Sequence, residues 1–428
     1  MDLALEAFGL TDVGRKRQHN EDAMLLDKAV GLYIVADGMG GHAAGEVASA
    51  RAAEVVKATI AANQKVMKDL ARDASQGNRA NAAALVEGAV QKACADIYKM
   101  ALADSSQRGM GTTFVCLAVS GAAGVIGHVG DSRVYLLREG QCHRLTEDHT
   151  LVAAQLKAGT ITKEQAANSQ YRNVITRAVG IQESCQVDTL VVDVLPGDLF
   201  LLCSDGLHGY VNDEELVPLV KGMAPKDLPA KLVAMANERG GKDNITAVVV
   251  AAGAAVHSSA AANEELAEAQ SRMEALRKIP LFRHLTYKEQ TAVLSIAITR
   301  TFPGGREIVI EGQPGQELFV VIRGRVAIEK GGAEIAELRA GGHFGEMGLI
   351  DNAPRSATAR ATEPTRVMVI TRMDLMNLMK RESVLAVKLL WSFVQVLSDR
   401  LRATNSELSE IRQELAVAQA IAPFGEEE

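Results

Sequence analysis

Four aspartates each stand beside a run of apolar residues, and this shared placement suggests a common chemical task. Asp37 follows Tyr33–Ala36 in "YIVADGMGGHAAGE", and Asp205 repeats this setting in "LFLLCSDGLHGY". Asp131 follows "VIGHVG", and Asp243 precedes "NITAVVV". Apolar, β-branched runs of this length are typical of buried strands. The pattern therefore predicts acidic side chains at strand ends, where one edge of a sheet can gather them.

Carboxylates gathered in this way repel one another unless a cation compensates their charge. Glu21 and Asp22 in "RKRQHNEDA" add two adjacent acids before a further strand. Ligands that offer only oxygen suit Mg²⁺ or Mn²⁺ better than Zn²⁺. Two such ions can share a hydroxide that attacks phosphorus in line. A set of unrelated turn caps is the alternative, and spacing alone leaves it open.

Composition and the placement of the cysteines argue against a membrane protein, a secreted protein and a nucleic-acid-binding protein. With 428 residues, of which 47% are hydrophobic, the chain is expected to form two or three domains with sizeable cores. Neither a membrane-spanning apolar run nor a secretory signal pattern is evident. Five dispersed cysteines favour free thiols in a reducing cytosol, and the net charge of −7 argues against nucleic acid as a partner. We therefore expect a cytoplasmic protein that binds neither membranes nor nucleic acids.

The predicted secondary structure changes along the chain. Short β-rich runs are mixed with helical stretches at about 43–61 and 79–103, without strict alternation, which favours an α+β sandwich with outer helices. The small, polar stretch 251–265 is typical of a linker. From Phe302 short strands alternate with Gly-rich turns, as in a small β-roll. The expected parts are 1–252, a linker and helical segment at 253–278, a β-roll at 279–371 and a long helix at 372–428.

The first part contains an ordered series of motifs. They are "DVGRKRQHNEDA", "VADGMGGHAAGE", "GMGTTF", "HVGDSRVYLLR", "LTEDHTLV", "NVITRAVG", "LLCSDGLHGYV" and "KDNITAVVV". As a set they resemble the bacterial form of the PPM-type metal-dependent protein serine/threonine phosphatases. The resemblance implies an αββα β-sandwich that hydrolyses phosphoserine and phosphothreonine in phosphorylated proteins. It also implies two or three bound Mn²⁺ or Mg²⁺ ions.

Roles for single residues follow from the same resemblance. Asp37 is expected to bridge two metal ions, and the Gly38 carbonyl to bind one of them. The remaining implied metal ligands, which act directly or through water, are Glu21, Asp22, Asp131, Asp205 and Asp243, with Asp131 and Asp205 on a third ion. Arg17 is expected to bind the substrate phosphate, because a planar guanidinium can pair two phosphate oxygens. His42 is the expected general acid, and the region from "LVAAQL" to "NVITRAVG" resembles a substrate-selecting flap.

A second candidate site lies in "GGHFGEMGLIDNAPRSATARA". Glu346 and Arg355 stand nine residues apart in the predicted β-roll, whose interior rarely keeps unpaired charges. A ligand with an anionic phosphate and a ribose hydroxyl would satisfy Arg355 and Glu346, respectively. The alternative is a salt bridge between the two side chains.

The stretch from "IPLF" to "TRMDLMNLM" resembles a cyclic-nucleotide-binding domain, and "FGEMGLIDNAPRSATA" resembles its phosphate-binding cassette. The implied ligand is cyclic AMP or cyclic GMP, and Ser356 does not distinguish between them. The implied binding residues are Gly345, Glu346, Met347, Gly348, Arg355, Ser356 and Ala357.

The C-terminal helix carries a heptad seam of apolar residues. Its members are Leu390, Val394, Leu397, Leu401, Thr404, Leu408, Ile411 and Leu415. The length of the seam favours a homodimer, and a single amphipathic helix packed on the β-roll is the alternative.

Together these features predict a protein phosphatase that is regulated by a cyclic nucleotide. One alternative is a degenerate phosphatase that serves as a nucleotide-responsive binding or scaffold protein. Another retains the enzyme but leaves the β-roll without a nucleotide ligand.

Overall fold

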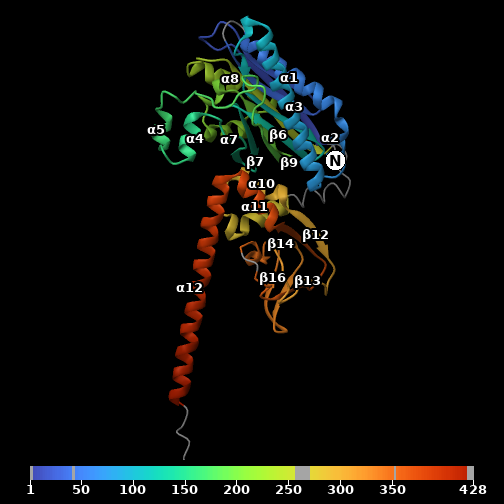
Figure 1. Cartoon of the computed structure of the whole chain (residues 1–428), viewed down its shortest axis with the longest axis vertical. Helices are drawn as coiled ribbons and strands as arrows, with labels where there is room; N and C mark the ends of the chain where they lie inside the picture. The colour runs from blue at the N-terminus through green and yellow to red at the C-terminus, as the bar shows by residue number, and fades with distance from the viewer. Residues whose placement is uncertain (1–2, 41–43, 256–269, 351–352, 422–428) are drawn as a thin grey trace, which may run out of the picture. The chain divides into compact units, whose positions relative to one another are not determined.

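The computed structural model describes residues 3–40, 44–255, 270–350 and 353–421. They form two compact units (Figure 1). The first unit comprises Met1–Met273 and Tyr287–Thr299, and the second comprises Glu274–Thr286 and Arg300–Glu428. None of the helices in the described ranges has the length and apolar character that crossing a membrane requires.

Two antiparallel sheets form the centre of the first unit. One has the strand order β1 (Leu3–Asp12), β11 (Ile245–Ala255), β10 (Leu199–Cys203), β7 (Arg133–Arg138) and β8 (Gln141–Arg144). The other has the order β2 (Asp22–Asp27), β3 (Leu32–Met39), β5 (Phe114–Ser120), β6 (Ala123–Val129) and β9 (Asp188–Asp193). The short strand β4 (Gly111–Thr112) pairs with β3.

Helices cover the outer faces of both sheets. The second sheet carries α1 (Ala44–Ala62), α2 (Gln64–Arg72) and α3 (Gln76–Ala103), and Figure 1 shows α1 beside α3. The first sheet carries α6 (Asp205–His208), α7 (Asp213–Gly222) and α8 (Leu228–Glu238).

Alternate residues of β3 belong to different cores. Tyr33 and Val35 pack between the two sheets, whereas Ile34 and Ala36 pack under α1 and α3. A strand covered on both faces is apolar without interruption, which explains the run before Asp37. The layers are thus helix, sheet, sheet and helix, which confirms the predicted αββα sandwich.

In the described residues of the second unit, two four-stranded antiparallel sheets precede two α-helices. One sheet has the order β12 (Ile298–Phe302), β19 (Thr365–Thr371), β14 (Glu317–Arg323) and β17 (His343–Phe344). The other has the order β13 (Glu307–Val309), β18 (Thr358–Ala361), β15 (Val326–Lys330) and β16 (Ala333–Leu338). The helices α11 (Arg372–Arg381) and α12 (Ser383–Ile421) follow, so the predicted β-roll and long C-terminal helix are both confirmed.

The helix α10 (Tyr287–Ile296) belongs to the first unit, although it precedes the β-roll directly in sequence. Tyr287 is buried and joins the core between the two sheets of the first unit. The division by sequence had assigned this helix to the β-roll part. Its packing on the first unit is a tertiary feature that local patterning does not reveal.

Candidate functional site

The acidic residues singled out from the sequence converge at the strand ends of the first unit. Asp22 on β2 lies directly opposite Asp37 on β3 in the strand register. Asp205 is the first residue of α6, directly after β10 and Ser204. Burial raises the pKa of Asp37 well above its ordinary value, and four neighbouring negative charges add to this effect: Asp22, Asp205, Asp131 and Asp243.

The same repulsion acts on the other members of the cluster. Burial raises the pKa of Asp22 to about 6 and that of Asp131 to about 7, and the charge of Asp205 adds to both shifts. Burial also raises the pKa of Asp205, with the charge of Asp243 as the next cause. The protein alone therefore disfavours full ionisation of these carboxylates at neutral pH.

Two carboxylate oxygens of the cluster are suited to a cation. Within the described part of the chain, Oδ1 of Asp22 and Oδ1 of Asp205 are buried without a hydrogen-bond partner. The other oxygen of Asp22 accepts hydrogen bonds from Ser204 Oγ at 2.8 Å and Thr246 Oγ1 at 2.6 Å. Buried anionic oxygens without a partner are costly. This donor set therefore fits hard divalent cations, which bind carboxylate oxygen.

The backbone around Asp37 is fixed on both sides. Thr113 N–H and Thr112 Oγ1 donate to the carbonyl of Asp37 at 2.8 and 2.9 Å. Gly38 packs so closely that an added Cβ would lie 2.1 Å from the carbonyl oxygen of Gly45 and 2.6 Å from that of Glu21. Only glycine fits here, because any side chain would collide with these backbone oxygens.

Arg17 lies at the rim of the acidic cluster and is about half exposed, with a side-chain exposure of 48%. Its Nη2 donates to Oδ2 of Asp243 at 2.9 Å, and its Nη1 lies 3.9 Å from Glu21 Oε2. The structure thus brings Arg17 and Glu21 to the cluster. His42 lies outside the described residues.

Asn244 is a positioning residue that the sequence analysis did not single out. Its Oδ1 accepts the backbone N–H of Glu21 at 2.8 Å, and its Nδ2 donates to the carbonyls of Val13 and His19 at 3.0 and 2.9 Å. One side chain therefore holds the loop that carries Arg17 and Glu21. In the sequence, the only indication of this role was that Asn244 directly follows Asp243, a predicted metal ligand.

The loop that carries Asp131 is fixed by the segment after β8. His149 N–H donates to the Gly130 carbonyl at 2.8 Å, and Gly130 N–H donates to His149 Nδ1 at 3.1 Å. Arg133 forms two hydrogen bonds with the Asp148 carboxylate, at 2.9 and 2.6 Å. Residues 148–149 therefore set the position of Asp131.

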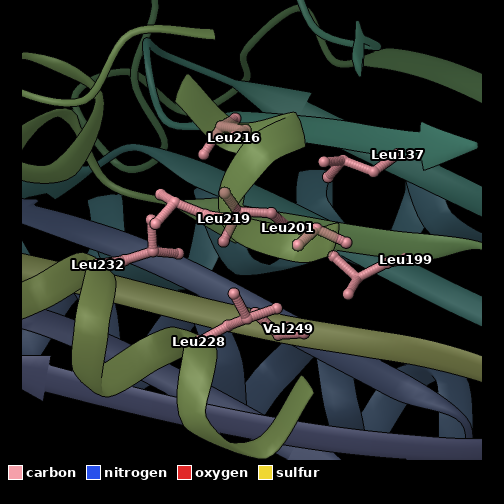
Figure 2. A pocket seen from close by; sticks show the side chains of 9 residues that line it. Leu137, Leu199, Leu201, Leu216, Leu219, Leu228, Leu232 and Val249 are labelled. Carbon is pink, nitrogen blue, oxygen red and sulfur yellow. The ribbon is translucent and has the colours of Figure 1, made fainter. Parts of the chain in front are cut away.

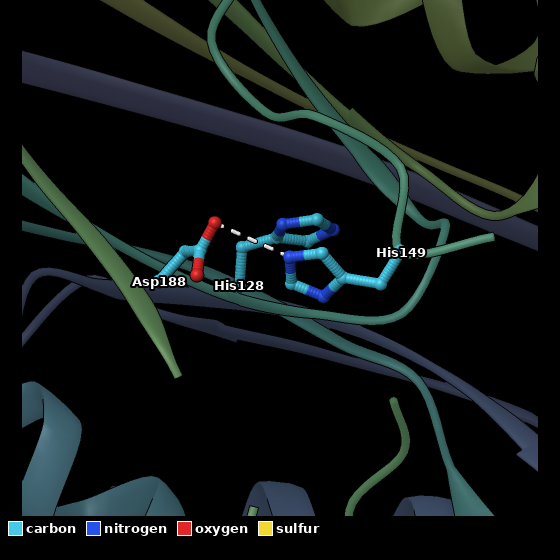
Figure 3. Close-up of side chains that lie close together, drawn as sticks. All are labelled: His128, His149 and Asp188. Atoms are coloured by element: carbon cyan, nitrogen blue, oxygen red, sulfur yellow. Dashed lines mark hydrogen bonds and ion pairs between the residues drawn. The ribbon is translucent and has the colours of Figure 1, made fainter. Parts of the chain in front are cut away.

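Figure 3 shows His128, His149 and Asp188, whose ligand atoms lie within 4.8 Å of one another. His149 Nδ1 accepts the Gly130 N–H at 3.1 Å, and His149 Nε2 lies 3.2 Å from Asp188 Oδ2 and 3.1 Å from Arg177 Nη1. Both ring nitrogens of His149 thus already contact protein groups. Arg177 also donates to Asp188 at 2.8 Å, which adds positive charge. We interpret this cluster as a set of contacts that holds His149 between Gly130 and Asp188, rather than as a metal site.

An apolar pocket lies between the first sheet and helices α7 and α8 (Figure 2). Its lining consists of leucine and valine side chains, among them Leu137, Leu216 and Leu232. Since these side chains offer no polar group, the pocket has no means of binding or activating a phosphate.

In the second unit Arg355 is buried and its guanidinium has several partners. Nη2 donates to Glu317 Oε2 at 2.8 Å, and Nη1 donates to the carbonyls of Glu317 and Gly345 at 3.0 and 3.2 Å. An added Cβ at Gly315 would lie 2.1 Å from Arg355 Nε, so glycine makes room for this side chain. The sequence analysis missed Glu317, which lies 38 residues from Arg355.

The remaining cassette residues surround this arginine. Gly345 has a φ of 80° and precedes the short 3-10 helix η4 (Glu346–Leu349), which contains Met347 and Gly348. Ser356 is exposed and Ala357 is half-buried directly after Arg355. The structure thus brings the Gly345 turn and Arg355 together.

Two parts of the chain match known family models. Residues 13–239 match protein phosphatase 2C, and residues 299–382 match the cyclic nucleotide-binding domain. The serine/threonine phosphatase stp of Listeria innocua is 37% identical over 246 residues, which cover 56% of this chain and 93% of that protein.

Solved structures show the same similarity. The Mycobacterium tuberculosis serine/threonine phosphatase PstP/Ppp is 32% identical with a TM-score of 0.52, over 58% of this chain and 99% of that chain. A catalytic domain of PstP in complex with two manganese ions is 31% identical with a TM-score of 0.50, over 59% of this chain and 100% of that chain.

Proposed function

Because this chain belongs to the protein phosphatase 2C family, we propose that its acidic cluster hydrolyses phosphoserine and phosphothreonine with two divalent metal ions. The chain is a protein serine/threonine phosphatase and contains a cyclic nucleotide-binding domain, as the ordered motifs predicted. The observation that carries the proposal is the convergence of buried aspartates with two unpartnered oxygens, on Asp22 and Asp205.

The five free cysteines support a cytoplasmic location.

The proposed metal ligands are Asp37, the Gly38 carbonyl, Glu21, Asp22, Asp205 and Asp243, with Asp131 and Asp205 on a third ion. Bound divalent ions would supply a hydroxide nucleophile and neutralise phosphate charge. Mn²⁺ is supported by the similar domain in complex with manganese, and Mg²⁺ suits the same oxygen donors. Ser204 and Thr246 orient Asp22 so that its free oxygen remains available.

Arg17 is proposed to bind the phosphate of the substrate. Its partial exposure allows a substrate to reach the guanidinium, and its hydrogen bond to Asp243 holds it over the cluster. Two phosphate oxygens can replace this contact in a forked geometry. Protonation of the leaving serine or threonine oxygen is proposed for His42, on the resemblance alone.

Arg355 is proposed to bind the phosphate of cyclic AMP or cyclic GMP, and Glu346 the ribose. A buried guanidinium requires an anionic partner, and Glu317 supplies one at 2.8 Å. The Glu317 side chain is 35% exposed, so it is free to leave when a ligand phosphate replaces it.

The packing of α10 supports regulation of the phosphatase by this ligand. Arg138 Nη1 donates to the Tyr287 hydroxyl at 2.5 Å, and the Tyr287 ring stacks on His143 at a centroid distance of 4.1 Å. His143 lies on β8, which leads into the segment that fixes Asp131. Because α10 continues directly into β12 of the β-roll, the helix that packs on His143 is joined through the chain to the ligand-binding sheet.

A homodimer through α12 is part of the proposal. Six members of the seam are exposed by 39–63%, namely Leu390, Val394, Leu397, Leu401, Leu408 and Ile411. The side chains of Thr404 and Leu415 lie outside the described ones. A heptad-spaced apolar stripe of this length suits a second copy of the same helix.

Phosphate release from a phosphothreonine peptide tests the enzymatic proposal. We expect release by the purified full chain with Mn²⁺ or Mg²⁺ and none in excess chelator. A scaffold without activity would release none under either condition. Calorimetry with each cyclic nucleotide tests the second site, and absence of binding would leave the β-roll without this ligand.

A further inference from the structure

Cys94 and Cys185 lie together where helix α3 meets the loop before β9. Cys94 is buried on the helix, and Cys185 is partly exposed and packs against the same apolar core. Gln91, one helical turn before Cys94, holds this loop in place. Its Nε2 donates to the Cys185 carbonyl, and its Oε1 accepts the Cys185 N–H at 3.3 Å.

The Cys94 sulfur has further contacts with the same loop. It accepts the Gly180 N–H at 3.3 Å and lies 3.2 Å from the carbonyl oxygen of Gln182. The loop thus contacts the helix at Gly180, Gln182 and Cys185. Dispersed positions in the sequence gave no sign of this pairing.

We propose that Cys94 and Cys185 form a reversible disulfide bond when the protein meets a low-molecular-weight disulfide. This modification site is independent of the metal-binding and nucleotide-binding proposals. Reversible disulfides of this kind are the ones found in reducing compartments.

The electrostatics of the five cysteines favour reaction at this pair. A hydrogen bond from the Cys185 thiol lowers the pKa of Cys94 to about 7, and the same hydrogen bond raises the pKa of Cys185. Burial raises the pKa of each of the other three thiols to about 12: Cys116, Cys142 and Cys203. The thiolate is the reactive form of cysteine, and at neutral pH Cys94 carries far more of it than Cys116, Cys142 or Cys203.

The reaction consists of two exchange steps. Loss of one proton leaves the thiolate on Cys94, where the hydrogen bond from Cys185 stabilises it. Transfer of the Cys185 proton to Cys94 along this hydrogen bond then makes the partly exposed Cys185 the thiolate that an external disulfide can reach. Attack on that disulfide forms a mixed disulfide and releases one small thiolate. Cys94 then loses its proton, and its thiolate attacks the Cys185 sulfur, which forms the protein disulfide and releases the second. The two protons of the cysteines end on the two small thiols, and the external disulfide is reduced by two electrons.

The bond would restrain a segment that is connected to the acidic cluster. The loop follows Val179, whose backbone exchanges hydrogen bonds of 3.0 and 2.9 Å with Thr112. Thr112 in turn donates to the Asp37 carbonyl. Oxidation should therefore slow amide hydrogen exchange in residues 179–187.

The test treats the purified full chain with glutathione disulfide at neutral pH, followed by thiol counting and peptide mapping. We expect loss of two of the five thiols, recovery of one peptide pair linked through Cys94 and Cys185, and full reversal by dithiothreitol. Cys185→Ser should abolish the linked peptide, whereas the matched variant Cys142→Ser should retain it. Cys185 is partly exposed, so its replacement avoids a change in the buried core.

Three results would overturn the proposal. They are retention of all five thiols, mixed disulfides with glutathione that do not proceed to a linked peptide, and a link that involves a different cysteine. Unchanged hydrogen exchange in residues 179–187 after oxidation would overturn the proposed restraint of that loop.

Discussion

The guanidinium of Arg355 donates a hydrogen bond to Glu317 Oε2 at 2.8 Å, so a carboxylate already stands where the proposed ligand phosphate would bind. The same guanidinium donates to the carbonyls of Glu317 and Gly345. A phosphate that arrives must displace one anionic partner of a buried cation. We therefore expect Glu317 to lower the affinity for the nucleotide and to stabilise Arg355 when no ligand is bound.

Glu317→Gln should strengthen cyclic nucleotide binding. The amide keeps the shape of the side chain but removes the charge that competes with phosphate, so a gain of about 1.4 kcal/mol, or about tenfold in affinity, is expected. Calorimetry with cyclic AMP and cyclic GMP measures the change. Glu329→Gln, at a carboxylate that pairs with Arg360 instead, is the matched control and should have no effect. Equal or weaker binding by Glu317→Gln would refute the competition.

Asp205→Asn should lower phosphatase turnover by orders of magnitude while the protein remains folded. The change removes the charge of a proposed ligand and replaces one of its two carboxylate oxygens by an amide NH₂ group, which cannot bind a cation. It also relieves repulsion, so the metal-free variant should melt no lower than the metal-free wild type. Peptide dephosphorylation and thermal melting check both outcomes, with Asp69→Asn at an exposed ion pair as the control. Near-normal turnover would contradict the two-metal mechanism.

Stabilisation by Mn²⁺ should increase with pH between about pH 5 and about pH 8. In the metal-free folded protein the pKa values of Asp22 and Asp131 are raised to about 6 and about 7, mainly by burial. Below these values a metal ion must displace protons, and above them it meets free carboxylates. The difference in melting temperature with and without Mn²⁺ isolates this effect, because other titrating groups contribute to both states. A difference independent of pH would be inconsistent with these ligands.

The sequence predicted the acidic cluster because each aspartate follows or precedes a strand whose apolar residues fix its position. It did not predict Asn244 or Glu317, since both act through partners that only the fold brings near. Asn244 bonds to Glu21, 223 residues away. The docking of α10 was missed for a related reason. Tyr287 contacts Arg138 and His143 across a long chain separation, and no local pattern encodes such a contact.

Tyr287→Ala should remove the nucleotide response of the phosphatase but preserve nucleotide affinity and basal turnover. The change deletes both the stack on His143 and the hydrogen bond from Arg138, whose guanidinium remains paired with Asp198. Tyr287→Phe keeps the ring, so a partial response is expected. A typical coupling of about 1–3 kcal/mol corresponds to a change of roughly five- to 150-fold in the wild type. A full change in turnover on nucleotide binding by Tyr287→Ala would show that the Tyr287 contacts are not needed for regulation. No change in the wild type would refute regulation itself.

The double variant Leu401→Asp and Leu408→Asp should convert the proposed homodimer into a monomer. Both side chains are exposed on α12, by 63% and 48%, and charges at seam positions would be buried without partners in a coiled coil. Truncation after about Lys380 is a less specific test, because it also removes Leu385 and Leu389, which are buried. Light scattering should report half the wild-type mass for the double variant and an unchanged mass for the control Ser406→Asp. A wild-type chain that is already monomeric, or a double variant that remains dimeric, would exclude this seam as the interface.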